Sequence, residues 1–379
     1  MVIAGEASGD QLAAELVAAL REQLPEAAFF GAGGAKMSAA GVTLIHEMSQ
    51  LAVVGITDVL AKLFQLHRLM EKLMAAALER QPDVIIGVDY GAFNLRFAHK
   101  VKEYLRNNPF STWKPKVVKF VSPQVWASRP GRAKQLAADH DLVLTIFPFE
   151  KDWLAQRVPQ LRVEFVGHPM VGRFSAEELR SRRPGPGVVG PAQILLLPGS
   201  RKSELKRHLP AMLGALRMIQ LTLPDTRAKM ILPNQSLKEL AEKLTGQATN
   251  LDIVSGSLPE ALPHADLAMA KTGTVTMECA FFGVPAVTLY KGSWLNYQIA
   301  RHLITVKTFT MPNLLAGEEV YPEFLQYELT AENLARAALD LLQNEARRQK
   351  IKLRLAEIVA SLGEPGAPKR AAEAILRLE

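Results

Sequence analysis

The chain has 379 residues, which is enough for two ordinary domains and a large buried core. Its composition, 48% hydrophobic and 22% charged, excludes a disordered chain, and no run of about 18 apolar residues predicts a membrane-spanning helix. The formal net charge of +7 favours anionic partners, namely nucleotides, nucleic acid or acidic lipid headgroups.

Short β-branched runs alternate with longer helical patterns in the first half of the chain, as in α/β folds with parallel sheets. The predicted strands are residues 2–4, 28–31, 84–88, 117–120, 142–146 and 163–166. The helical patterns between them include residues 11–21 and 58–79.

A segment rich in Arg, Pro and Gly at residues 180–187 interrupts this pattern and indicates a linker. A second α/β series follows, with predicted strands at residues 194–197, 229–232, 251–254, 267–270 and 286–289. The remainder, from about residue 331 to 378, has a helical pattern. The fold class predicted is α/β, with two doubly wound Rossmann-like domains facing a cleft and ligands at the carboxyl ends of the strands.

The stretch Gly5-Glu6-Ala7-Ser8-Gly9-Asp10 joins the first predicted strand to the first helix. Glycines there let the backbone approach a ligand, and the helix N-terminus favours an anion. A plain N-cap by Ser8 or Asp10 is the alternative interpretation. Neither the dinucleotide-binding fingerprint nor a P-loop is present.

Asp89 ends the predicted strand 84–88, so its carboxylate is expected on the ligand side of the sheet. In that place a carboxylate can act as a general base, or it can cap a turn or a helix.

Two loops of the second half combine small residues with polar groups at predicted strand ends. The first contains Gly199, Ser200 and Arg201, and its amides, hydroxyl and guanidinium suit a diphosphate, although helix capping is the alternative. The second is Lys271-Thr272-Gly273-Thr274, with Glu278 one helical turn further on, where a carboxylate can accept from ribose hydroxyls. Together they predict a nucleotide-diphosphate site.

The motif Asp139-His140-Asp141 invites a metal interpretation, but it precedes its predicted strand and is expected at the end opposite to the cleft. No Cys/His cluster has zinc spacing. We therefore expect no metal and no other cofactor.

Residues 58–70 combine a wide apolar face with the basic residues Lys62, His67 and Arg68. Such a face suits an interfacial helix that contacts a membrane, and a buried amphipathic core helix is the alternative. The candidate membrane-contacting side chains are Val59, Leu60, Leu63, Phe64 and Leu66.

The stretch at residues 5–10 resembles the signature of the lipid-A-disaccharide synthase family, which comprises metal-independent inverting glycosyltransferases of the GT-B fold. The resemblance extends over essentially the whole chain. The other matching stretches are Leu51-Ala52-Val53-Val54-Gly55-Ile56, Gly87-Val88-Asp89 with Phe93-Asn94, Val121-Ser122-Pro123-Gln124-Val125-Trp126-Ala127, Phe147-Pro148-Phe149-Glu150, Gly167-His168-Pro169-Met170, Leu197-Pro198-Gly199-Ser200-Arg201, Gly273-Thr274 with Glu278, and Met311-Pro312-Asn313-Leu314-Leu315-Ala316-Gly317. The sequence departs from the family pattern at Gly91, Ser128 and Gly172, which bears on acceptor fit.

The resemblance implies transfer of 2,3-diacylglucosamine from its UDP donor to 2,3-diacylglucosamine 1-phosphate (lipid X), with inversion. The products are lipid A disaccharide 1-phosphate and UDP. It further implies a cytoplasmic enzyme that associates peripherally with the inner face of the inner membrane, with a homodimer left open. The single cysteine, Cys279, agrees with a reducing compartment, and scattered basic residues argue against nucleic acid.

Within that activity, Asp89 is expected as the general base, Arg201 as a partner of the leaving diphosphate, and Ser8 and Asn313 as substrate-positioning groups. The expected substrate- and UDP-binding residues are Gly5, Glu6, Gly9, Asp10, Asn94, Gly199, Ser200, Thr272, Gly273, Thr274 and Glu278.

The expected regions are an acceptor-binding and membrane-contacting domain at residues 1–172, a donor-binding domain at 173–345, and helices at 346–379 that cross back to the first domain. Three alternatives remain: a lipid-II-type N-acetylglucosaminyltransferase, a UDP-sugar 2-epimerase, and a non-catalytic nucleotide- or lipid-binding relative.

Overall fold

The computed structural model describes residues 1–48, 58–174, 190–246, 250–256, 258–294, 297–298, 304, 306 and 308–378, with the backbone alone at 58–63. Contacts divide the chain into two units. Unit 1 comprises Met1–Arg173 and Leu362–Glu379, and unit 2 comprises Phe174–Ser361.

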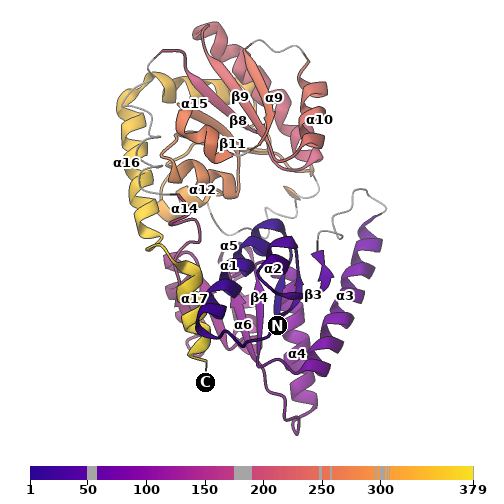
Figure 1. Cartoon of the computed structure of the whole chain (residues 1–379). Coiled ribbons are helices and arrows are strands. Elements are labelled where there is room, and N and C mark those ends of the chain that lie inside the picture. Colours follow the sequence, from indigo (N-terminus) through magenta and orange to yellow (C-terminus); the bar gives the residue numbers. More distant parts are fainter. Residues whose placement is uncertain are drawn as a thin grey trace. The chain divides into compact units, whose positions relative to one another are not determined.

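Unit 1 is built on a seven-stranded sheet in the order β3-β2-β1-β4-β5-β6-β7, and each neighbouring pair is parallel (Figure 1). The central strands are nearly continuous apolar runs, as expected for parallel strands that helices cover on both faces. The strands are β1 (Val2–Ala4), β2 (Phe30–Gly33), β3 (Thr43–Glu47), β4 (Val84–Val88), β5 (Lys116–Phe120), β6 (Leu142–Thr145) and β7 (Arg162–Phe165).

The helices of unit 1 cover this sheet and bury its apolar side chains. On α3 the buried residues Leu69, Leu73 and Ala77 recur every four positions and join the same core as Phe93 and Phe97 of α4. The last helix, α17, packs beside α1 (Figure 1). The helices are α1 (Ala7–Gln23), α2 (Ala35–Ala39), α3 (Asp58–Arg80), α4 (Gly91–Asn107), α5 (Val125–Ser128), α6 (Arg132–Asp139), α7 (Pro148–Ala155) and α17 (Ala367–Leu376).

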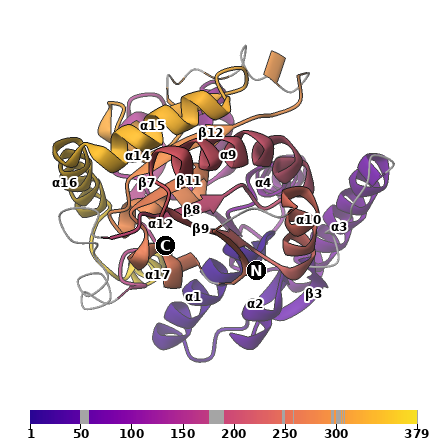
Figure 2. The ribbon, with the colours of Figure 1, turned by 90° about the horizontal axis from the view of Figure 1, so that it is seen from above.

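Unit 2 repeats the design with a six-stranded parallel sheet in the order β10-β9-β8-β11-β12-β13. The strands are β8 (Gln193–Leu197), β9 (Arg227–Leu232), β10 (Leu251–Ser255), β11 (Leu267–Lys271), β12 (Ala286–Tyr290) and β13 (Glu323–Leu325). Helices α9 and α15 lie against each other along one face (Figure 2). The helices are α9 (Lys202–Thr222), α10 (Gln235–Thr245), α11 (Leu258–Ala261), the 3-10 turn η2 (Leu262–His264), α12 (Thr274–Phe281), α14 (Met311–Ala316), α15 (Ala331–Gln343) and α16 (Glu345–Ser361).

The prediction of two doubly wound α/β domains is confirmed. Each predicted strand overlaps an observed one, with ends that differ by up to two residues. Two strands were not predicted, β3 and β13, and both are edge strands that bury only part of their side chains. The predicted linker at residues 180–187 lies outside the described residues, as does the motif at residues 51–56.

Candidate functional site

The strand order reverses between β1 and β4 in unit 1 and between β8 and β11 in unit 2. In doubly wound folds such a reversal opens a crevice at the carboxyl ends of the two strands, where ligands bind. The predicted site motifs that follow these four strands therefore fall at the two ligand-binding positions of the fold.

In unit 1 the loops that follow β1 and β4 start side by side, because Ala4 pairs with Val88. A Cβ built on Gly9 would lie 3.5 Å from the Cβ of Asp89. A Cβ on Gly5 would lie 2.2 Å from Cγ of Tyr90, so the close approach of the Tyr90 ring requires glycine there. The structure thus brings the motif at residues 5–10 and Asp89 together.

The N-terminus of α1 opens at this crevice. Glu6 is its N-cap residue, in an extended conformation, and its own side chain makes no capping hydrogen bond. Glu6 and Ser8 are exposed. Amides of a first helical turn that side chains leave uncapped can bind an anion or a substrate hydroxyl.

Asp89 and Tyr90 form a turn with left-handed backbone, with φ values of 47° and 42°. This conformation costs a non-glycine residue about 1–3 kcal/mol and persists where surrounding contacts determine it. Here the amide of Asp89 donates to Phe120 O at 2.8 Å, and its carbonyl accepts from Asn94 Nδ2 at 3.0 Å and from Lys119 Nζ.

Lys119 is a fully buried lysine near the carboxyl end of β5. Its ammonium also donates to Gly87 O at 3.2 Å. Burial lowers the pKa of Lys119 to about 7, and the negative charge of Asp89 opposes this shift. Through these hydrogen bonds the lysine supports the turn that contains Asp89.

The side chains of Asp10 and Asn94 are buried and bind the protein itself. Asp10 accepts from the amides of Gly34, Lys36 and Met37 at 2.7–3.2 Å and so caps α2. Asn94 Nδ2 also donates to the carbonyls of Ile3 and Val88, both at 3.2 Å. This geometry favours support of the loops over direct contact with substrate.

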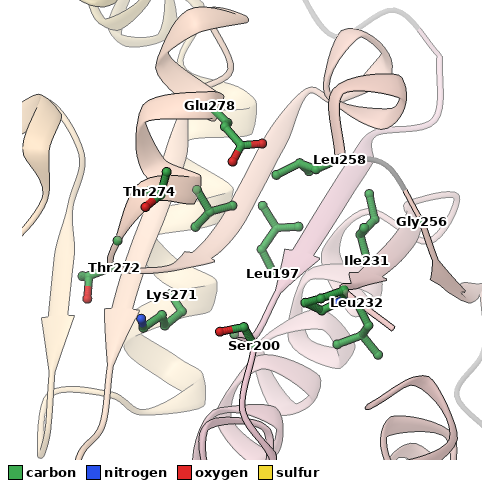
Figure 3. A pocket seen from close by; sticks show the side chains of 14 residues that line it. Leu197, Ser200, Ile231, Leu232, Gly256, Leu258, Lys271, Thr272, Thr274 and Glu278 are labelled. Carbon is green, nitrogen blue, oxygen red and sulfur yellow. The ribbon is translucent and has the colours of Figure 1, made fainter. Parts of the chain in front are cut away.

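In unit 2 a pocket of about 380 Å³ lies at the carboxyl ends of β8 and β11. Apolar side chains from β9 and α11 occupy one side, and polar groups of the two predicted phosphate loops occupy the other (Figure 3). The lining residues are Leu197, Gly199, Ser200, Ile231, Leu232, Pro233, Gly256, Leu258, Lys271, Thr272, Gly273, Thr274, Val275 and Glu278. An apolar pocket with convergent polar groups has the composition of a small-molecule site.

The loop after β8 is held by Glu204. Its buried carboxylate accepts from the amide of Ser200 at 2.9 Å through Oε2. Gly199 has φ 126°, and a Cβ there would lie 2.4 Å from Glu204 Oε2, so this close approach requires glycine. Arg201 is 71% exposed and lies 3.7 Å from Glu204.

The loop after β11 leads into α12. Gly273 is the N-cap residue with φ 140° and has no side chain of its own to cap the helix. The exposed Thr274 begins the helix, and Glu278 lines the pocket one turn later. Uncapped amides and a hydroxyl at this turn suit phosphate oxygens.

Buried His208 connects the loop after β8 to the end of β12. Its Nδ1 lies 2.6 Å from Pro198 O, and the amide of Lys291 donates to its Nε2 at 3.0 Å. These two contacts require a neutral ring that carries its proton on Nδ1. Burial lowers the pKa of His208, which favours the same neutral form.

Asn313 lies on α14 with its side chain fully buried. Its Nδ2 donates to Tyr321 O and to Glu323 Oε1, both at 2.8 Å, and its Oδ1 accepts from the amides of Val320 and Tyr321. A positioning role for Asn313 would therefore act through the segment that it holds.

Asp139 and Asp141 bind nearby side chains of the protein. Asp139 binds His99 at 2.9 Å, and Asp141 accepts from Lys102 Nζ and from the amide of Val117, both at 2.7 Å. Burial lowers the pKa of His140, between them, to about 4. Within the described residues, no group of three His, Cys, Asp or Glu side chains could hold a metal ion.

The amino-terminal end of α3 projects from the rest of unit 1 (Figure 2). Phe64 is 59% exposed, and the Arg68 guanidinium lies 4.8 Å from the centre of its ring. Leu66 is half-buried against the core. The side chains of Val59, Leu60 and Leu63 lie outside the described residues. Within those residues, no helix is both long and apolar enough to cross a membrane.

Several contacts that hold these loops and their surroundings were not predicted. A lysine inside the apolar strand 116–120 was the available signal for Lys119, because lysine is rarely buried without a partner. Lys271 was visible in its loop motif, but its contact with Glu204 at 3.6 Å depends on the fold. The bond from Trp126 Nε1 to Glu150 Oε1 at 3.0 Å joins two of the matching stretches and could not be read from either alone.

Known proteins resemble this chain over its whole length. A family model described as lipid-A-disaccharide synthetase matches residues 1–377. The chain is 37% identical to a lipid-A-disaccharide synthase of Myxococcus xanthus, with 100% of this chain and 97% of the relative covered. It is 36% identical to that of Solibacter usitatus, with 99% and 96% covered. Among solved structures, a UDP-GlcNAc 2-epimerase from Neisseria meningitidis bound to UDP-GlcNAc has a TM-score of 0.62. The alignment covers 99% of this chain and 98% of that one at 12% identity, which shows a likeness of fold alone. Because the family model and the relatives match the sequence from end to end, this chain belongs to the lipid-A-disaccharide synthase family.

Proposed function

We propose that the chain transfers 2,3-diacylglucosamine from its UDP donor to the 6-hydroxyl of 2,3-diacylglucosamine 1-phosphate (lipid X). The products are the β-1′,6-linked lipid A disaccharide 1-phosphate and UDP. The observation that carries this proposal is the family match over residues 1–377, with the family's glycine and phosphate loops at both strand-order reversals.

The unit 2 pocket is the proposed donor site. Its apolar side, with Ile231, Leu232 and Leu258, suits the uracil ring, and the loops at Ser200 and Gly273 suit the diphosphate (Figure 3). Glu278 lines the same pocket and is proposed to accept from ribose hydroxyls.

Asp89 is proposed as the general base for the acceptor. The primary hydroxyl is a weak nucleophile until a base takes its proton during attack. Asp89 is partly exposed at the end of β4, beside the uncapped N-terminus of α1, where a hydroxyl can reach it. In-line attack on the α-linked anomeric carbon then gives the β product.

The bond that breaks leaves its electron pair on the UDP oxygen, so negative charge grows on the diphosphate. Amides at the start of α12 and the positively charged side chain of Lys271, which lines the pocket, would stabilise that charge. Arg201 was assigned this role from the sequence, and it remains a candidate that would have to turn toward the ligand.

Both proposed substrates carry acyl chains, and each buried CH₂ favours the bilayer by about 0.8 kcal/mol. We therefore propose that the enzyme works at the cytoplasmic face of the inner membrane. The exposed Phe64 and the neighbouring Arg68 on α3 are the described side chains that suit an anionic bilayer surface.

The test is to incubate the purified chain with UDP-2,3-diacylglucosamine and lipid X and to identify the products by mass spectrometry. We expect the disaccharide 1-phosphate together with UDP. Absence of the disaccharide with both substrates present would refute the proposal. Isotope exchange at C2 of UDP-N-acetylglucosamine would instead reveal an epimerase.

A further inference from the structure

Lys271 begins the second of the two loops of the unit 2 pocket. It ends β11, lines the pocket, and its side chain is 23% exposed (Figure 3). A Cβ built on Gly273 would lie 3.5 Å from Lys271 Nζ, so the ammonium is adjacent to the turn that begins α12. A positive charge and a helix N-terminus thus face the same part of the pocket.

Glu204 forms an ion pair with this ammonium. Its Oε1 lies 3.6 Å from Lys271 Nζ, while its Oε2 accepts from the amide of Ser200. The carboxylate is buried and comes from the first turn of α9. One side chain therefore sets both the loop after β8 and the position of Lys271.

Two other described neighbours of Lys271, Tyr290 and His208, do not neutralise its charge. The Tyr290 ring lies 5.8 Å from Nζ, a distance at which a ring attracts a cation weakly. His208 is neutral, as its two hydrogen bonds require. In contrast, Arg201 is 71% exposed and is not among the described residues that line the pocket.

We propose that Lys271 binds the diphosphate of the nucleotide and that Glu204 positions its ammonium for this contact. The inference rests on the proposed function, because it assumes a UDP-linked donor in this pocket. It assigns the diphosphate contact to the Lys271 side chain, whereas the sequence predicted only that the loop beginning at Lys271 holds phosphate. A compact ammonium on a strand end, held by a buried carboxylate, needs little rearrangement to meet phosphate oxygens.

The experiment is isothermal titration of UDP and of uridine into the wild-type chain and into the variants Lys271→Gln and Lys271→Met. Loss of one charge-assisted contact is expected to weaken UDP binding about 10- to 150-fold. Uridine lacks the diphosphate, so its affinity should stay at the wild-type value. Lys291→Gln is the matched control: Lys291 is an exposed lysine at the end of the neighbouring strand and does not line the pocket, so this variant should bind UDP like the wild type.

Two variants are used so that the test can be made with either one. The variant that is used must melt at the wild-type temperature. Suppose that the wild-type chain forms the disaccharide and that a folded Lys271 variant binds UDP as tightly as the wild type. This result overturns the inference and leaves the proposed function intact. An equal loss of UDP and uridine binding also overturns it, because the residue would then only shape the pocket. A wild-type chain that neither binds UDP nor forms the disaccharide refutes the proposed function, and the inference with it.

Discussion

The ammonium of Lys119 donates a hydrogen bond to the backbone carbonyl of Asp89 from inside the sheet of unit 1. The same carbonyl accepts from Asn94 Nδ2, so two buried donors hold the left-handed turn at Asp89 and Tyr90. This arrangement fixes the backbone of Asp89 and leaves its partly exposed carboxylate at the crevice between β1 and β4. Preorganisation of this kind is what a general base needs.

Asp89→Asn is expected to lower turnover by about 10²–10⁴-fold, the usual contribution of a general base. Asparagine keeps the size of the side chain and the backbone contacts, so the fold should be unchanged. The affinity for UDP should also be unchanged, since the unit 2 pocket does not contain Asp89. Steady-state kinetics with titration of UDP measures both quantities, and turnover at the wild-type level would remove Asp89 from the mechanism.

Lys119→Met is expected to change how the unfolding free energy depends on pH. Burial lowers the pKa of Lys119 to about 7 in the folded chain, whereas an unfolded lysine titrates near about 10.4. Between these values the unfolded chain binds one proton more, so the lysine's contribution to the unfolding free energy rises with pH and is least favourable below about pH 7.

Urea unfolding of wild type and variant at about pH 7 and about pH 9.5 checks this, because other titrating groups cancel in the difference. The unfolding free energy of the variant relative to the wild type should be higher at the lower pH. A difference that does not vary with pH would mean that Lys119 keeps an ordinary pKa.

The sequence predicted the loops of the site well because each loop follows a strand whose apolar run is unmistakable. Asp89 after Val88 and Gly273 after Lys271 are such cases. The partners that hold the loops could not be predicted in the same way. Lys119 of β5 reaches the residue that follows the paired strand β4, and Glu204 of α9 reaches Lys271 at the end of β11. Both contacts therefore exist only once the fold has formed.

For Asp10 and Asn313 the sequence suggested a direct contact with substrate, whereas the structure shows side chains that bind the protein itself. Both lie in stretches that match the family signature, and polarity in such a stretch suggests substrate contact. In the structure their oxygen and nitrogen atoms bind backbone groups of nearby segments. A motif alone does not distinguish a residue that touches substrate from one that shapes the loop.

Trp126→Phe is expected to cost more stability at high pH than at low pH. Trp126 Nε1 donates to the buried carboxyl of Glu150, and burial raises the pKa of Glu150 to about 7. The folded chain therefore holds this proton between about pH 4.5 and 7, and the contribution of Glu150 to the unfolding free energy falls as pH rises through that window.

Above about pH 7 the lost bond is one to a charged group, worth about 1 kcal/mol more than a bond to a neutral carboxyl. Chemical unfolding of wild type and variant at about pH 5 and about pH 8 measures the two losses. Equal losses would show that Glu150 has the same charge at both values.

A chelator such as EDTA is expected to leave turnover unchanged. The charge that grows on the leaving diphosphate meets Lys271 and the amides that begin α12, so the reaction as proposed needs no divalent ion. Turnover with and without EDTA, followed by readdition of Mg²⁺, is the measurement. Activity that EDTA abolishes and Mg²⁺ restores would overturn the metal-free mechanism.

The last prediction separates membrane contact from core on a single helix. Phe64 and Leu73 both lie on α3, but Phe64 is 59% exposed beside Arg68, whereas Leu73 is fully buried in the core of unit 1. Phe64→Ser should therefore reduce sedimentation with vesicles that contain anionic phospholipid and should leave the melting temperature unchanged. The wild-type binding should weaken as salt rises, because the Arg68 charge contributes to it.

Leu73→Ser is the matched control, because it removes a side chain of similar character from the other side of α3. Large-to-small core substitutions cost about 2–5 kcal/mol, so this variant should melt at a clearly lower temperature. A fall of the melting temperature in Phe64→Ser as large as in Leu73→Ser would mean that Phe64 packs in the folded protein. Unchanged vesicle binding in a stable Phe64→Ser variant would move the membrane contact away from this part of α3.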